Sequence, residues 1–301
     1  MRKKKKHFLG KLIKFVFLLS LLVVIFMGSI YVYSSYTEYE YTSADGTNTV
    51  IEGKKEYVTA LICGVNSNLT DTIMFVKFDV QNGDILIMSI PRDTYVDNIY
   101  CVGHKINAIY RGKNIIPLVE EIQGQLNEEI DYYMIFDTDL VHAIVDEIGG
   151  VEVDVPFDMQ YDDPTQDLHI DLKAGKQVLN GGQVEQYVRF RHNNDMTVQY
   201  AMGDLGRVET QQDFMKQLIS TILKPQNLLK IKDLVDIITT QTETNITWQD
   251  VLRYGLDAIK LKDGEIITET ASGEATYIGN GSYFLLDQED TRQVIKEAFK
   301  E

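Results

Sequence analysis

The chain has 301 residues, of which 44% are apolar and 25% are charged, a balance that is typical of a folded globular protein and argues against a wholly disordered chain. The net charge of −16 argues against general nucleic-acid binding. Only two cysteines are present, which excludes a disulfide scaffold and a four-cysteine metal site.

The charge is distributed unevenly along the chain. Residues 1–14 contain seven Lys or Arg residues and no acid, whereas the remainder carries 22 basic residues against all 45 acidic ones, a net charge of −23. An uncharged apolar run of 19 residues follows at 15–33. At about 1.5 Å per residue this run spans about 28 Å, which is close to the thickness of a bilayer's hydrocarbon core.

We therefore predict a cytoplasmic basic segment at 1–14, a single transmembrane anchor at 15–33 and an extracytoplasmic remainder, because positive charge before a span stays in the cytoplasm. A cleaved signal peptide is the alternative. The length of the apolar run and the lack of an A-x-A-like cleavage site argue against it. The expected location is the cell membrane.

The extracytoplasmic part begins with a polar segment, residues 34–56, which shows no clear period and is predicted to be a stalk. The globular pattern starts at Tyr57. Apolar or alternating runs predict strands, with a hairpin turn at Asn82-Gly83, over 58–65, 73–80, 85–90, 130–136 and 151–155. Residues 157–181 and 192–203 are predicted to be loops.

Helical spacing of apolar residues predicts helices over 115–126, 139–148, 182–190, 204–223, 227–240, 248–261 and 288–299. Thr138 and Thr247 are the expected N-caps of two of them, and a strand region is expected near 265–286. The interleaved elements predict an α/β fold over residues 57–301, an α-β-α sandwich with a mixed central sheet flanked by helices. Cys63 falls in a predicted buried strand, which favours an inert thiol over a disulfide with Cys101.

The arginines carry most of the chemical signal. Outside the anchor there are seven, against 15 lysines, and four of them lie in three unusual contexts, SIPRD, YVRFR and GDLGR. The guanidinium fork binds phosphate oxygens in pairs and stays charged, so converging arginines would give an acidic domain a site for pyrophosphate. Asp204, Arg207 and Gln211 share one face near a helix N-terminus, which favours anions. Spacing alone nevertheless favours ordinary surface ion pairs such as Asp204 with Arg207.

Three further residues could also contribute to a site for phosphate or for a metal ion. Arg189 and Arg191 share a face only if their stretch is extended. Asp71 follows an apolar strand across a short loop, residues 66–70, where an acid could hold Mg²⁺ together with phosphate oxygens. Spacing alone favours a turn or cap aspartate there.

These segments together resemble the LytR-CpsA-Psr family of cell-wall proteins. The resemblance rests on LICGVNSN, LTDTIMFVKFD, MSIPRDTYV, HKINAIY, IDYYMIFD, IVDEIGGVEVDVP, YVRFRH, GDLGRVETQQDF and GNGSYFLLDQED, which cover most of residues 58–300 in the family's order. SIPRDT, DEIGGVEVDVP and YVRFR followed by GDLGR form a specific combination. A short cytoplasmic segment and a single anchor also fit the family.

The resemblance implies an enzyme, a glycopolymer phosphotransferase of cell-wall biogenesis. Such proteins take a phosphoglycan (a wall teichoic acid, a capsule or another glycopolymer) from undecaprenyl pyrophosphate. They transfer it to peptidoglycan, typically to the C6 hydroxyl of N-acetylmuramic acid, so that a phosphodiester forms and undecaprenyl phosphate leaves. The implied partners are therefore the lipid-linked glycan, peptidoglycan and the membrane. A lipid tunnel between sheet and helices is also implied.

The resemblance also assigns roles to single residues. Arg92 in SIPRD would contact the pyrophosphate and belongs to the implied catalytic set with Asp71 and Asp204. Asp71 matches a ligand of Mg²⁺ (or Mn²⁺), and Asp204 would orient an arginine or assist proton transfer. The other implied pyrophosphate contacts are Arg189, Arg191, Arg207 and Gln211.

The sequence departs from the family pattern at a few of these positions. Asn66 stands where the family often has an aspartate that is a second candidate for metal binding, and an amide brings an oxygen but no charge. Leu69, Thr70 and Thr210 stand where arginines are common. A non-catalytic polyprenyl-pyrophosphate-binding envelope protein and a lipid pyrophosphatase therefore remain alternatives. A membrane-linked regulator is a third, although the cytoplasmic segment is too short to fold.

Overall fold

A computed structural model describes residues 38–66, 69–101, 103–110, 114–165, 168–200, 204–255 and 257–299. The predicted basic segment and anchor, residues 1–33, lie outside these ranges. Among the residues that the structure describes, no helix combines the length and apolar character needed to cross a bilayer.

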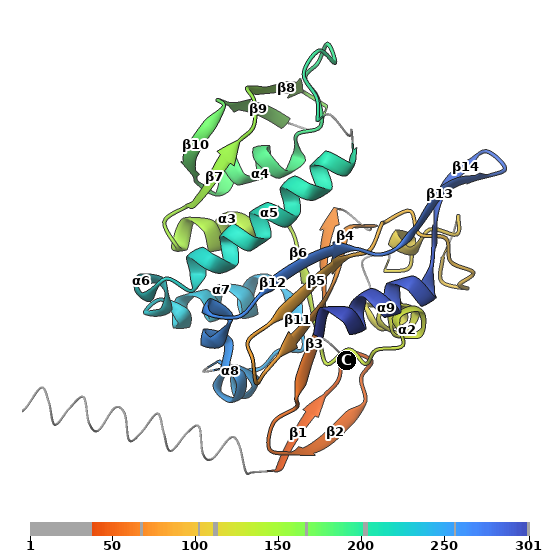
Figure 1. The fold of residues 1–301 in the computed structure, drawn as a ribbon, viewed down its shortest axis with the longest axis vertical. Helices are drawn as coiled ribbons and strands as arrows, with labels where there is room; N and C mark the ends of the chain where they lie inside the picture. The colour runs from red at the N-terminus through yellow and green to blue at the C-terminus, as the bar shows by residue number, and fades with distance from the viewer. Residues whose placement is uncertain are drawn as a thin grey trace, which may run out of the picture.

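A mixed sheet of six strands forms the centre of the molecule (Figure 1), as predicted. β3 runs parallel to β6, β4 runs antiparallel to both of its neighbours, and β12 runs parallel to β5. The strands in spatial order are β11 (Glu243–Thr244), β6 (Tyr132–Phe136), β3 (Tyr57–Asn66), β4 (Leu69–Asp79), β5 (Ile85–Ser89) and β12 (Ile266–Thr270). The carboxyl ends of β3, β5, β6 and β12 consequently lie at one edge of the sheet.

The predicted hairpin between β4 and β5 is confirmed. Its turn contains Gly83, whose φ of +85° is a conformation that glycine adopts without strain. β4 nevertheless begins at Leu69 and not at residue 73, so Asp71 lies within the strand and the expected loop is shorter. Thr70 is fully buried and Ile73 is 2% exposed, which shows why pairing with β3 extends to the edge of the sheet.

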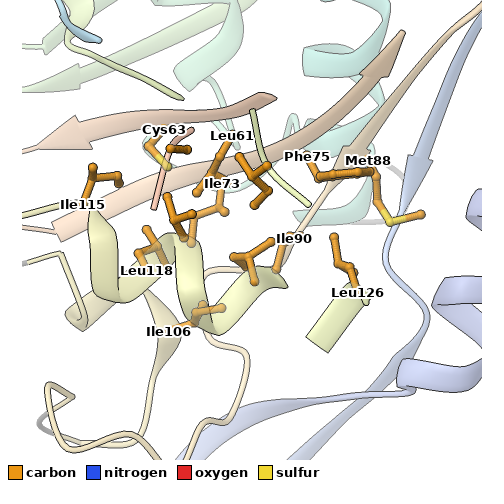
Figure 2. Packing of buried hydrophobic residues seen from close by; sticks show 14 of the residues in the cluster. Leu61, Cys63, Ile73, Phe75, Met88, Ile90, Ile106, Ile115, Leu118 and Leu126 are labelled. Carbon is orange, nitrogen blue, oxygen red and sulfur yellow. The ribbon is translucent and has the colours of Figure 1, made fainter. Parts of the chain in front are cut away.

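Alternating side chains of β3 and β4 divide between two apolar layers. On one face, Leu61, Cys63, Ile73 and Phe75 pack with residues of α2 (Ile116–Leu126), as Figure 2 shows. Helix α9 (Gln288–Phe299) contributes Ile295 to the same layer.

On the other face, residues such as Met74 and Ile87 pack with Met215 and Ile219 of α5 (Asp204–Ile222). Helices thus cover both faces of the sheet, which confirms the predicted sandwich. Cys63 and Cys101 are free, and burial raises the pKa of the Cys63 thiol, so Cys63 is the inert core thiol that was expected.

A second apolar core lies beyond α5, whose Met215 contacts both cores (Figure 1). It is formed by α3 (Thr138–Glu147), α4 (Gly181–Arg189) and two antiparallel strand pairs. The strands are β7 (Val151–Val155), β8 (Met159–Asp163), β9 (Leu168–Leu172) and β10 (Gly175–Leu179). The prediction of a loop over 157–181 is wrong, because the buried Leu168, Ile170 and Leu172 alternate with polar residues in a strand of only five residues.

Residues 34–56 were predicted to be a stalk, but the described part of this segment is folded. β1 (Glu38–Thr42) and β2 (Asn48–Glu52) form an antiparallel hairpin. Tyr41 is 7% exposed and its hydroxyl donates to Asp131 Oδ1 at 2.8 Å. Lys55 forms an ion pair with the same carboxylate. The hairpin therefore packs against the domain.

Most of the other helices agree with the predicted spans within a few residues, but the helix predicted over 248–261 ends at Tyr254 and is followed by a 3-10 segment at Asp257–Lys262. Thr247 caps its helix as predicted, whereas Asp137, and not Thr138, caps α3 by accepting from Leu140 N. The remaining elements are η1 (Ile106–Ala108), α6 (Pro225–Leu228), α7 (Ile231–Gln241), α8 (Trp248–Tyr254), η2 (Asp257–Lys262), β13 (Gly273–Ile278) and β14 (Gly281–Leu286).

Candidate functional site

Asp71 and Arg92 meet at the edge of the sheet where β3 and β5 end. Because Met74 pairs with Ser89, Asp71 on β4 and Arg92 in the turn after β5 each lie three residues beyond this pair, in the same direction. Arg92 Nη1 is 2.7 Å from Asp71 Oδ1, and both side chains are exposed, by 41% and 42%. The structure therefore brings together two of the predicted site residues that are 21 positions apart.

The turn that carries Arg92 is fixed by its backbone and by neighbouring side chains. Thr94 donates to Pro91 O from its backbone N at 3.0 Å and from its hydroxyl at 2.6 Å. The buried Asn107 donates its backbone N–H to Arg92 O at 3.2 Å. These contacts hold the backbone of Arg92 in place while its guanidinium remains accessible to a ligand.

Arg189 ends α4, and Arg191 follows it across one buried residue. Phe190 is extended, with φ −61° and ψ 135°, and fully buried. The stretch is helical through Arg189, so the extended conformation that would place both arginines on one face is limited to Phe190. Arg191 is exposed.

Two residues that the sequence did not single out lie beside Arg189. Glu185 Oε1 is 2.7 Å from Arg189 Nη1, and Glu185 Oε2 is 3.0 Å from His142 Nε2 of α3. The i,i+4 spacing of Glu185 and Arg189 on one helix is a signal that could have revealed this pair. The contact with His142 depends on the packing of α3 against α4, which no local pattern shows.

Helix α5 links the arginine segments to the same edge of the sheet. The Gln211 side-chain amide donates to Val188 O at 3.1 Å, next to Arg189. The Gln212 amide donates to Glu269 O at 3.0 Å, at the end of β12. Since β12 pairs with β5 as far as Ser89, these contacts connect the end of α4, α5 and the Arg92 turn.

For the predicted site residues Asp204, Arg207 and Asn66, the structure describes only the position of the backbone. Asp204 and Arg207 lie in the first turn of α5, and Asn66 is the last residue of β3. Their side chains lie outside the described part of the structure. The predicted pairing of Asn66 with Asp71 as metal ligands therefore stays a prediction, as does the role of Asp204.

The number of carboxylates at this site limits how a divalent cation could bind. Asp71 supplies one carboxylate, and Mg²⁺ that binds phosphorylated substrates commonly uses one or two carboxylates together with phosphate oxygens. Within the described ranges, no group of three or more His, Cys, Asp or Glu residues could enclose a metal ion. The Asp71 carboxylate fits a cation that is also held by phosphate oxygens.

Tyr110, in the HKINAIY segment, is a buried ionisable residue. Burial, with a smaller effect from the Glu243 carboxylate, raises the pKa of Tyr110 to about 12. Its hydroxyl donates to Glu243 Oε2 at 3.2 Å. The phenol therefore stays protonated at neutral pH.

Comparison with known proteins assigns the family. The model of the LytR_cpsA_psr family matches residues 26–300. The chain belongs to this family. A curated relative from Bacillus subtilis, named polyisoprenyl-teichoic acid–peptidoglycan teichoic acid transferase TagV, is 28% identical over 97% of this chain and 78% of its own. The regulatory protein MsrR of Staphylococcus aureus is 28% identical over 77% of this chain and 69% of its own.

Solved structures of the family share the fold described above. The crystal structure of Bacillus subtilis TagV superposes with a TM-score of 0.67 at 28% identity, covering 82% of this chain and 98% of TagV. A structure of TagT bound to LIIa-WTA gives a TM-score of 0.63 at 20% identity, covering 82% and 91% of the two chains. The second likeness supports the fold alone.

Proposed function

We propose that this LytR_cpsA_psr protein transfers a phosphoglycan from undecaprenyl pyrophosphate to peptidoglycan. The observation that carries the proposal is the accessible Arg92 guanidinium at the edge of the sheet, 2.7 Å from Asp71, with the end of α4 and α5 linked to the same edge. The name of the relative TagV supports a teichoic acid as the glycan and peptidoglycan as the acceptor.

The transfer breaks one phosphoanhydride bond and forms one phosphoester bond. A peptidoglycan hydroxyl, in our proposal the C6 hydroxyl of N-acetylmuramic acid, attacks the phosphorus that bears the glycan. The bond from this phosphorus to the bridging oxygen breaks, and undecaprenyl phosphate leaves with that oxygen as a stable anion. The hydroxyl proton goes to a base, for which Asp204 and Asp71 are the candidates.

Arginines perform the main task in such a reaction, because phosphoryl transfer depends on positioning and on charge neutralisation. In our proposal Arg92, Arg189, Arg191 and Arg207 contact the diphosphate oxygens. Gln211, which is bonded to Val188 O, fixes the backbone beside Arg189. Mg²⁺ or Mn²⁺ held by Asp71 would neutralise further charge on the diphosphate.

We also propose a cellular location, which rests on the sequence alone. We propose that residues 15–33 anchor the protein in the cell membrane and that the folded domain lies outside, where peptidoglycan is found. Seven basic residues precede the apolar run and no acid does, which supports a cytoplasmic N-terminus.

An assay of the full-length protein in detergent tests the proposal. The protein is incubated with an undecaprenyl-pyrophosphate glycan and uncrosslinked peptidoglycan strands, with Mg²⁺ or with EDTA, and phosphodiester-linked product is sought by mass spectrometry. Metal-dependent product is the expected result. Bound lipid without turnover would identify a binding protein instead, and lipid phosphate release without an acceptor would identify a pyrophosphatase.

A further inference from the structure

The chain that follows the Arg92 turn forms a small patch of sheet through isolated β-bridges to a neighbouring segment on each side. On one side, Phe284 N of β14 donates to Asp93 O at 2.9 Å, and Tyr95 N donates to Phe284 O at 2.8 Å. On the other side, Ile106 N donates to Thr94 O at 2.9 Å. Figure 1 shows that the β13–β14 hairpin, which supplies the first partner, projects away from the body of the molecule.

The two faces of this small sheet differ in composition. Thr94 and Ile106 are fully buried and point into the main core. Side chains alternate along strands, and Thr94 pairs with Phe284, so Tyr95 and Tyr283 occupy the opposite face. Their ring centroids lie 5.5 Å apart at an interplanar angle of 79°, and both rings are partly exposed.

Polar groups surround the two rings. The His104 ring stacks on Tyr95 at 5.4 Å and 13°, and its side chain is 49% exposed. Lys105 Nζ lies 5.7 Å from the centroid of Tyr283 and forms a 2.8 Å ion pair with Asp93. The face therefore combines flat apolar surfaces with hydrogen-bonding groups around them.

The same face continues into a cavity at the base of the hairpin. The cavity has a volume of about 640 Å³ and is lined by residues 272–274 and 285–288 and by Asp290. Leu285 lies two residues from Tyr283 and pairs with Glu274, so both cavity residues lie on the face of Tyr283. The cavity is open to solvent, and the acids Glu274, Asp287 and Asp290 give its lining a negative charge.

We propose that this face binds the sugar rings of the acceptor glycan strand. The apolar face of a pyranose ring packs against an aromatic ring, and its hydroxyl and acetamido groups hydrogen-bond to the polar surroundings. The acids of the cavity disfavour a polymer rich in phosphate, because like charges oppose each other across an interface. Uncharged N-acetylhexosamine units fit both the aromatic rings and the acidic lining. Asp93, whose carboxylate pairs with Lys105 beside Tyr283, directly follows Arg92 in the chain. The inference rests on the proposed function, whose acceptor it locates.

Binding of a short uncharged glycan to the full-length protein in detergent tests the proposal directly. The probe is the linear tetramer of N-acetylglucosamine, titrated by calorimetry without a lipid donor. Tyr283→Ala should weaken binding by about tenfold or more, which corresponds to about 1.4 kcal/mol. Tyr283→Phe keeps the ring and should bind like the wild type.

Tyr277 offers a matched control on the same hairpin. It is 78% exposed and lies next to Thr276, the partner of Tyr283, so it points to the other side of the hairpin. Tyr277→Ala should leave tetramer binding unchanged. In the wild-type protein the tetramer should shift the NMR ring signals of Tyr283 and leave those of Tyr277 in place, a result that does not depend on any variant being folded.

Several outcomes would overturn the proposal. These are no binding of the tetramer, equal binding by a folded Tyr283→Ala protein, or tighter binding of a glycerol-phosphate oligomer than of the tetramer. Absence of tetramer binding with normal transfer to peptidoglycan would remove this site and leave the proposed function intact. Tetramer binding at Tyr283 without any transfer would instead refute the proposed transferase.

Discussion

Replacing Arg92 with alanine should abolish transfer while leaving the protein almost as stable as the wild type. The side chain pairs with Asp71 at 2.7 Å, but the two groups are 41% and 42% exposed. Exposed ion pairs of this kind contribute about 0.2–1 kcal/mol to the free energy of unfolding. A loss of 1 kcal/mol lowers the melting temperature of a domain of this size by about 2–4 °C.

The effect on the reaction should be far larger. A charged donor that contacts the oxygens on which negative charge develops contributes about 10²–10³ to the rate, or about 2.7–4 kcal/mol. Arg92→Lys keeps the charge but loses the planar pair of donors, so its rate should lie between those of the wild type and Arg92→Ala. Initial rates of phosphodiester formation, measured with saturating lipid-linked donor and Mg²⁺, give the comparison.

An ion pair far from the site provides the control. Lys173 and Asp158 lie 3.1 Å apart and are 66% and 56% exposed. Lys173→Ala should change stability as little as Arg92→Ala does and should retain full transfer. A folded Arg92→Ala protein that keeps more than about a tenth of the wild-type rate would contradict the assignment of Arg92.

Three further predictions concern metal binding and stability. If residue 66 is a metal ligand, as the family resemblance implies, Asn66→Asp should tighten Mg²⁺ binding in a calorimetric titration, and an unchanged affinity would remove this residue from the metal site. Asp131→Ala should lower the free energy of unfolding in urea by about 3 kcal/mol, because the Tyr41 hydroxyl, Thr59 N and Lys55 lose the buried carboxylate that they share; a loss below about 1 kcal/mol would show that the hairpin is not held there. Burial raises the pKa of Tyr110 and of Tyr187 to about 12 from 10. Their contribution to stability should therefore be complete below pH 10 and lost as the pH rises to about 12, and denaturant unfolding that is independent of pH across this window would contradict the shifts.

The main sheet was predictable from the sequence because its strands bury apolar residues on both faces. The sequences of β3 and β4 are therefore long apolar runs, and Asn82-Gly83 marks the hairpin between β4 and β5. The strands β8 to β10 were missed, since each has only five residues and few of these are apolar in β8 and β10, whereas the equally short β7 has a valine at every second position. Such short amphipathic strands gain their stability from packing on α4 and α5, which a local pattern does not show.

The site was predictable only in part, for a related reason. Family motifs identified Arg92 and Asp71 as site residues, but their direct ion pair depends on the register of β4 against β5, which aligns Met74 with Ser89. Glu185 was overlooked because its i,i+4 pair with Arg189 resembles an ordinary surface pair on a helix. Which site residues contact each other depends on the packing of elements far apart in the chain, and the spacing of residues in the sequence does not show that packing.

The ion pairs of the site show how an acidic chain can keep arginine side chains available for an anionic ligand. Arg92 pairs with Asp71, and Arg189 pairs with Glu185. Each carboxylate offsets the repulsion that would arise if guanidinium groups gathered without a ligand. The side chains of Arg92 and Asp71 are 41% and 42% exposed, so this pair can exchange partners with water at little cost. In the proposed reaction the diphosphate would take the place of these carboxylates. Asp71 would then be released from Arg92 when a cation arrives with the substrate, so both partners of this contact would become available to the substrate.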